Sequence, residues 1–236
     1  MRSLFTCAFL PACLALVAIP VLAATKDDPV LSMLKIDKLE ARDSDDGTLG
    51  ALEGYLWIGK DLNKAWIKTK GERTSETTEV AEIQLLYSRA IDTNWDLQLG
   101  GRHDTFPDTE RNWATIGFNG IAPYWFEIDT ALFVGENGQK SLRFEAEYEF
   151  MLTQKWVLYP EIEVNWFSED DDELGIGSGL AGVEAGLRLR YEITRQFAPY
   201  VGVNYERLLG DTEDIAKAAG EVTSETQLVA GLRFWF

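Results

Sequence analysis

Glu-Thr-Gln-Leu-Val-Ala-Gly-Leu-Arg-Phe-Trp-Phe, residues 225–236, is the stretch of this sequence that decides the fold. Counting back from Phe236, every second residue as far as Leu228 is apolar, whereas the intervening set includes Arg233 and Gln227. A two-residue period is that of a β-strand, whose successive side chains point to opposite faces. An outer-membrane barrel needs such strands, with one face toward lipid and the other toward water. We therefore expect residues 225–236 to form the closing strand of a barrel.

The same alternation recurs along the chain in segments of the length that tilted membrane strands require. Short connections alternate with longer or more polar ones, as expected when periplasmic turns and external loops lie at opposite ends of a barrel. The prediction is an all-β fold, a twelve-stranded antiparallel transmembrane β-barrel over residues 31–236. The expected strands are 31–42, 49–60, 64–74, 79–90, 94–106, 111–121, 124–135, 140–151, 155–168, 179–192, 196–209 and 225–236.

The apolar face of these strands is predicted to point outward. In the eighth strand Leu142 and Phe144 alternate with Arg143, Glu145 and Glu147, so that one side is apolar and the other is ionised. A soluble barrel of the lipocalin kind is the alternative, because it shares the antiparallel meander. Such a barrel turns its apolar face inward, which the ionised face argues against.

The N-terminus has the features of a secretory signal peptide. An apolar run from Leu4 to Leu22 follows Arg2 and ends in small residues, so we expect a signal peptide over 1–23 and a short periplasmic segment over 24–30. Both cysteines of the chain, Cys7 and Cys13, lie within the predicted leader. The mature chain is then expected to lack disulfides and thiolate metal ligands.

The composition is strongly acidic. The chain has 22 basic and 39 acidic residues, and its net charge is −17. A surface of this charge repels the phosphate backbone, so we expect no nucleic-acid partner. After the leader no stretch has the length of a membrane-spanning helix, so membrane insertion requires a closed barrel.

Several separated runs of the sequence resemble the copper resistance protein B family of Gram-negative outer membranes. The resemblance covers nearly the whole mature chain and rests on residues 57–69, 122–127, 177–180, 186–192, 197–203 and 231–236. It implies a barrel of the outer membrane, in contact with its lipid, that acts in copper resistance beside a periplasmic multicopper oxidase. Family members often carry a segment rich in Met and His before the barrel. Here residues 24–50 contain only Met33 and no His, and this departure from the family's pattern argues against a thioether copper-collecting role at the N-terminus.

Carboxylates on the lumenal face are the candidate metal ligands. Counting back from the connections places Asp129 opposite Glu147 and Glu145 opposite Glu161. Carboxylate oxygens accept copper(II), whereas copper(I) prefers sulfur or imidazole. Two interpretations stay open: a cation path along these acids, or a lumen filled with structural ion pairs. The arginines available for such pairs are Arg102, Arg143, Arg188, Arg190 and Arg233.

His103 is the only histidine of the chain and the remaining metal-ligand candidate. Counting residues back from the strand connections places His103 on the outward face near the external end of the fifth strand, between Ala81 and Ala114. Catalysis of the Ser/His type needs a serine within hydrogen-bond reach of the base, and the count places none there. We therefore expect no enzyme. The predicted function is copper binding or passage across the outer membrane; the alternative is a general diffusion channel or a structural barrel without a metal role.

Overall fold

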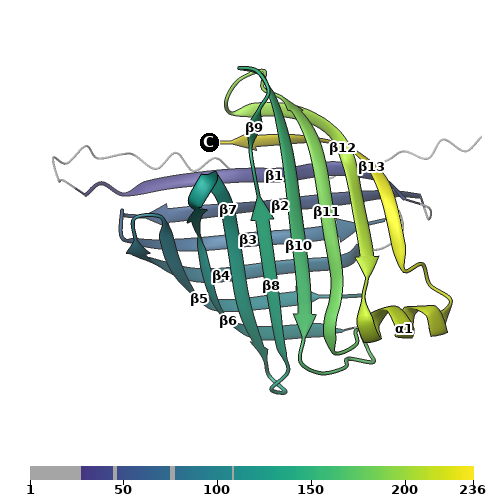
Figure 1. Cartoon of the computed structure of the whole chain (residues 1–236). Helices are drawn as coiled ribbons and strands as arrows, with labels where there is room; N and C mark the ends of the chain where they lie inside the picture. Colours follow the sequence, from purple (N-terminus) through teal and green to yellow (C-terminus); the bar gives the residue numbers. More distant parts are fainter. Residues whose placement is uncertain (1–27, 45–46, 75–77, 108) are drawn as a thin grey trace, which may run out of the picture.

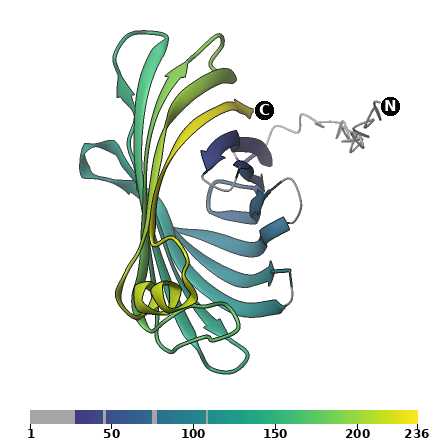
Figure 2. The same ribbon diagram turned by 90° about the vertical axis from the view of Figure 1, so that its right-hand side faces the viewer.

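The computed structural model describes residues 28–44, 47–74, 78–107 and 109–236 and shows one closed antiparallel β-barrel (Figures 1 and 2). The predicted signal peptide lies outside the described residues. Thirteen strand segments form the wall: β1 (Leu31–Ser44), β2 (Gly47–Gly59), β3 (Asn63–Arg73), β4 (Thr78–Asp92), β5 (Trp95–Thr105), β6 (Glu110–Ala122), β7 (Phe126–Gly135), β8 (Lys140–Glu147), β9 (Phe150–Met151), β10 (Trp156–Phe167), β11 (Gly179–Tyr191), β12 (Phe197–Leu208) and β13 (Ser224–Trp235).

The barrel has twelve strands, because β8 and β9 are two parts of one strand. Both segments pair with β10, and the break between them at Tyr148 and Glu149 lies opposite Pro160. A proline lacks the N–H that a ladder requires. The carbonyl of Pro160 still accepts a hydrogen bond from the Tyr148 backbone N–H, at 3.1 Å. The proline is thus accommodated by a local interruption, and the predicted twelve-stranded barrel is confirmed.

The last strand closes the barrel as the sequence predicts. β13 pairs with β12 on one side and with β1 on the other. Phe236 and Leu34 exchange backbone hydrogen bonds of 2.9 Å in both directions. All twelve predicted strands are present, and each predicted end lies within two residues of the observed one. Alternation of side chains and turn residues was therefore enough to delimit the strands.

The two faces of the wall have the predicted polarity. On β13 Leu228 is 64% exposed on the outer surface, whereas its neighbour Gln227 is 3% exposed in the lumen. The same division holds on β11, where Leu187 is exposed and Arg188 is buried. Not every aromatic residue near a strand end joins the outer surface. Trp57 lies opposite Trp66 and contacts its ring on the lumenal side, with ring centroids 6.1 Å apart.

One long connection contains a helix that the strand pattern did not predict. Helix α1 (Gly210–Ala219) lies between β12 and β13, beside the ends of these strands in Figure 1. It ends at Gly220, which adopts φ 81° and caps the helix in the left-handed region that glycine favours. The Thr212 hydroxyl accepts a hydrogen bond from the Gly177 backbone N–H at 2.9 Å, which ties α1 to the connection between β10 and β11. In the described part of the chain no helix has the length and apolar character that a membrane crossing requires.

At Gly231 the barrel wall requires a residue without a side chain. A Cβ at this position would lie 2.6 Å from the Tyr200 ring and 2.8 Å from the Glu40 Cβ. We expect Gly231→Ala to lower the free energy of unfolding by about 1–3 kcal/mol, as overpacking does in tight cores. Gly71→Ala is the matched control, because a Cβ there would meet only the Val80 carbonyl at an ordinary 3.5 Å. Urea titration of the barrel in lipid vesicles measures both variants, and equal midpoints would contradict the expectation.

Candidate functional site

Six lumenal carboxylates lie in one continuous row across six neighbouring strands. The pairs are Asp129 with Glu145, Glu145 with Glu163, Glu163 with Glu184, Glu184 with Glu206, and Glu206 with Glu225. We call Asp129, Glu145, Glu163, Glu184, Glu206 and Glu225 the carboxylate row. Strands of a barrel are tilted, so directly opposed residues climb the wall from strand to strand.

The carboxylate row therefore runs from the periplasmic half of the lumen to its external mouth. Asp129 is the fourth residue of β7, which begins at the end with the short turns. Glu225 is the second residue of β13, which begins at the end with the long loops. In outer-membrane barrels short turns face the periplasm and long loops face outward. The acids thus form an oblique line along the direction that a solute would travel.

Basic side chains neutralise the row unevenly. Lys68 donates a hydrogen bond to Asp129, and Lys70 donates one to Glu163 at 2.5 Å. The nearest cation to Glu145 is Arg143, at 3.9 Å. Within the described residues Glu206 forms no ion pair. The row is accordingly well neutralised at Asp129 and Glu163, and weakly at Glu145 and Glu206.

A second, shorter line of acids lies beside the row. Glu127 pairs with Glu147, and Glu147 pairs with Glu161. Glu147 accepts a hydrogen bond from the Tyr159 hydroxyl. Glu161 Oε1 lies 3.0 Å from Lys38 Nζ and also accepts from Arg188, whereas its buried Oε2 accepts no hydrogen bond from any described residue. Glu147 and Glu161 line one narrow pocket in the lumen together with Glu145.

The predicted registers were wrong by two residues. The sequence count placed Asp129 opposite Glu147 and Glu145 opposite Glu161, whereas each predicted partner lies two residues from the observed one. Between β7 and β8 the connection is tighter than the count assumed, because Gly135 N–H donates to the Gln139 carbonyl at 2.8 Å. Between β8 and β10 it is wider, because Met151 lies opposite Val157. Asp129, Glu145, Glu147 and Glu161 still lie close together, because a shift of two keeps every side chain on its own face. The other row members become visible only once the registers are correct.

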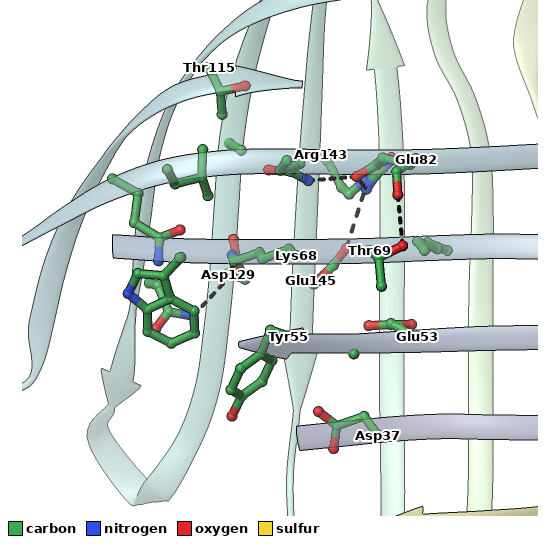
Figure 3. Close-up of a pocket in the computed structure, with 18 of the residues that line it drawn as sticks. Asp37, Glu53, Tyr55, Lys68, Thr69, Glu82, Thr115, Asp129, Arg143 and Glu145 are labelled. Carbon is green, nitrogen blue, oxygen red and sulfur yellow. Dashed lines mark hydrogen bonds and ion pairs between the residues drawn. The ribbon is translucent and has the colours of Figure 1, made fainter. Parts of the chain in front are cut away.

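The five arginines named from the sequence pair with acids, as the ion-pair interpretation requires. Arg143 donates to Glu82 at 2.9 and 3.1 Å across the lumen, which Figure 3 shows. Arg188 donates to Glu40, and Glu40 also accepts from the Tyr200 hydroxyl at 2.9 Å. The others also lie near acids: Arg102 near Glu82 and Asp104, Arg190 near Glu149, and Arg233 near Asp37 and Glu149. In the described part of the chain, no group of three or more His, Cys, Asp or Glu side chains has the arrangement of a metal-ion site.

His103 lies apart from the lumenal acids. It faces outward near the external end of β5, and its ring nitrogen Nδ1 is 2.8 Å from Asn112 Oδ1. Its cross-strand neighbours are Ile83 and Asn112, two residues from the predicted Ala81 and Ala114, so this register was also misjudged. Neither observed neighbour is a serine. The structure therefore places His103 on the outer surface of the barrel.

The acidic connection between β10 and β11 is more ordered than a solvated loop. Asp171 is buried and accepts hydrogen bonds from Arg111 and from the Glu173 backbone N–H. Arg111 also donates to the Glu173 carboxylate at 2.7 Å, and this hydrogen bond lowers the pKa of Glu173. The connection thus folds around one arginine at the external rim.

An outward apolar face, a charged lumen and closure through the last strand define a β-barrel protein of the outer membrane. Solved structures with this architecture are similar in fold. The NanC porin superimposes with a TM-score of 0.56 at 12% identity, covering 85% of this chain and 98% of that chain. The KdgM porin gives 0.51 at 10% identity, covering 86% and 99%. At these identities the likeness extends to the fold alone.

The family is shown by sequence. The family described as "Copper resistance protein B precursor (CopB)" matches residues 30–236. Copper resistance protein B of Escherichia coli is 43% identical over 213 residues, which are 90% of this chain and 72% of that protein. Its homolog in Pseudomonas syringae pv. tomato is 41% identical over 210 residues, 89% of this chain and 71% of that protein. The chain belongs to the copper resistance protein B family and is an outer-membrane copper resistance protein.

Proposed function

We propose that this barrel passes copper(II) across the outer membrane along the carboxylate row, without catalysis of its own. The observation that carries the proposal is the unbroken register of six acids on six strands, from Asp129 to Glu225. Carboxylate oxygens are acceptable ligands for copper(II), and successive weak sites allow an ion to enter and leave. Membership of the copper resistance protein B family points to copper as the ion, and the carboxylate row is the path that we propose for it.

The basic side chains that meet the row bear on how an ion passes a lumen crossed by ion pairs. Lys68 and Lys70 reach Asp129 and Glu163 from the opposite wall of the barrel. A copper ion arriving at these acids replaces an ammonium group that already compensates their charge, so each acid is neutralised before and after the step. We propose this exchange as the means by which the ion passes the ion pairs.

The test changes three row members that neither Lys68 nor Lys70 pairs: Glu145→Gln, Glu184→Gln and Glu206→Gln combined. We expect copper tolerance of a deletion strain carrying this variant to fall toward that of the empty deletion strain, because amide oxygens carry no charge to attract the ion. Cell-associated copper, read by elemental analysis after a copper challenge, gives the direction of movement. Zinc is the control metal.

The matched control removes three acids from the external connections instead. Glu136→Gln, Asp172→Asn and Glu221→Gln change the net charge equally, and all three side chains are exposed. We expect full copper tolerance from this variant, provided that heat-modifiable migration shows equal amounts of folded barrel. Unchanged copper tolerance in the row variant would contradict the proposal and favour a general channel or a structural barrel.

A periplasmic multicopper oxidase is the partner that we propose from the family resemblance. Such an enzyme would act on copper at the end of the row that Asp129 occupies. Deleting the gene for that oxidase in a strain with the intact barrel is expected to reduce copper tolerance further than the row variant alone. Equal copper tolerance in the oxidase-deletion strain and in the strain with the row variant would argue against separate contributions of the oxidase and the barrel.

A further inference from the structure

Three buried hydrogen-bond donors without a partner among the described residues line one cavity of the lumen. They are Trp66 Nε1, Gln98 Nε2 and Thr115 Oγ1, on side chains that are 9%, 2% and 5% exposed. None of the three atoms has a hydrogen-bond partner among the described residues. All three side chains line the same cavity of about 160 Å³. A buried donor left unpaired costs free energy, so three at one cavity call for an explanation.

The strand registers place these donors on one wall. Trp66 lies opposite Leu86, Leu86 opposite Gly100, and Gly100 opposite Thr115, in a single line across β3 to β6. Gln98 precedes Gly100 by two residues and shares its face. Because Gly100 has no side chain, nothing from that position separates the amide of Gln98 from the hydroxyl of Thr115.

Basic side chains lie beside the donors, and each of them also pairs with an acid. Lys68 Nζ lies 5.9 Å from the centroid of the Trp66 ring. Arg102 and Arg143 lie over the Phe133 ring, whose residue is the cross-strand neighbour of Thr115. Donors beside cations are the arrangement that recognises a carboxylate.

Acids from several strands line the same cavity, and Asp37, Glu53 and Glu82 among them are paired with basic side chains. The acids that are weakly neutralised come from the opposite strands. Glu127, Glu145 and Glu147 come from β7 and β8, and Figure 3 shows Glu145 and Thr115 on different strands around this space. Within the described residues Glu127 forms no ion pair, and Glu145 is 3.9 Å from its nearest cation, Arg143. The hydrogen bond to Glu147 comes from the neutral Tyr159 hydroxyl. This side therefore attracts a cationic group.

We propose that the cavity binds a small zwitterion, a molecule with one carboxylate and one ammonium group. Its carboxylate accepts from donors of this wall, and its ammonium group faces Glu127, Glu145 and Glu147. A simple anion would meet three acids, and a simple cation would leave the donors unpaired. Only a molecule with both charges satisfies both walls.

The test is isothermal titration of the full folded chain in detergent micelles with ω-amino acids from glycine to 6-aminohexanoate, a series that varies the distance between the charges. Butyrate and butylammonium are the compounds with a single charge. We expect at least one ω-amino acid to bind about tenfold more tightly than either of them. Equal binding of butyrate, or binding of no member of the series, would overturn the proposal.

Substitutions of the donor side chains test whether these donors form the binding site. Trp66→Phe combined with Thr115→Val removes two donors at nearly constant shape, and we expect an affinity loss of about tenfold or more. Trp113→Phe is the matched control, because the Trp113 indole already donates to Asp104 at 2.9 Å. An equal loss in both variants would overturn the assignment. The titration contains no copper and the copper measurements need no amino acid, so each proposal can fail separately.

Discussion

Glu40→Gln is expected to lower the free energy of unfolding by about 3–5 kcal/mol, the usual cost of removing one partner from a buried ion pair. The Glu40 side chain is 0% exposed and accepts hydrogen bonds from Arg42 at 2.8 Å and from Arg188 at 2.9 and 3.0 Å. Both guanidinium groups are themselves at most 3% exposed. Without the carboxylate, two buried cations lose charge compensation that solvent cannot replace. Urea unfolding in lipid vesicles, followed by tryptophan fluorescence, measures the change.

A double variant tests whether uncompensated charge is the cause. Glu40→Leu with Arg188→Met removes the acid and one of its cations together, and Arg42 keeps Glu72 and Glu184 within 3.3 Å. We expect this variant to be more stable than Glu40→Gln, because apolar replacement of a complete buried pair is often neutral. Glu221→Gln, in an exposed connection, is expected to leave the midpoint unchanged. A double variant no more stable than the single one would contradict the explanation.

The strand plan of this barrel was predictable because it depends on properties of single residues. Alternation on β13 and β11 reports which face each side chain occupies, and turn residues report where each strand ends. A membrane barrel makes this signal clear, since one face meets lipid and the other meets charge. The assignment of Leu228 to the outer surface and Gln227 to the lumen needed no knowledge of neighbouring strands.

The carboxylate row was not predictable, because it depends on pairing between strands. A two-residue error keeps Glu145 on its correct face but moves its partner from Glu163 to Glu161. The error arises in the turn after Met151, which is wider than counting suggests because Met151 lies opposite Val157. The turn at residues 136–138, where Gly138 adopts φ 89°, is instead tighter and shifts the register between β7 and β8. Each further strand adds another register, so a row of six residues is lost when one register slips.

Helix α1 and the ordered acidic connection show a second limit. Residues 210–219 lie between two strands in a stretch that reads as a long loop, and nothing in the alternation marks a helix there. Its contact with Gly177 joins two connections that are distant in the sequence. The unpartnered donors at Trp66, Gln98 and Thr115 are likewise a property of three dimensions, because only the assembled wall shows which groups lack a partner.

Phe144→Arg is expected to lower the free energy of unfolding by about 2–4 kcal/mol, the cost of an arginine on the lipid face near the bilayer midplane. Phe144 lies in the middle of its barrel strand and is 39% exposed on the outer surface. The charge would enter hydrocarbon, where neither water nor a described acid on that face can compensate it. Urea titration in vesicles gives the size of the effect.

The depth of the substituted residue in the bilayer distinguishes the cost of a buried charge from that of an ordinary packing defect. His103 lies on the same outer surface but only two residues from the external end of β5. An arginine near the interface reaches water, so His103→Arg is expected to cost about 0–1 kcal/mol. A lipid face therefore predicts a large difference between the two variants. Equal costs would mean that the outer surface at Phe144 is not in the hydrocarbon layer, and the lumenal route from Asp129 to Glu225 would then no longer cross a membrane.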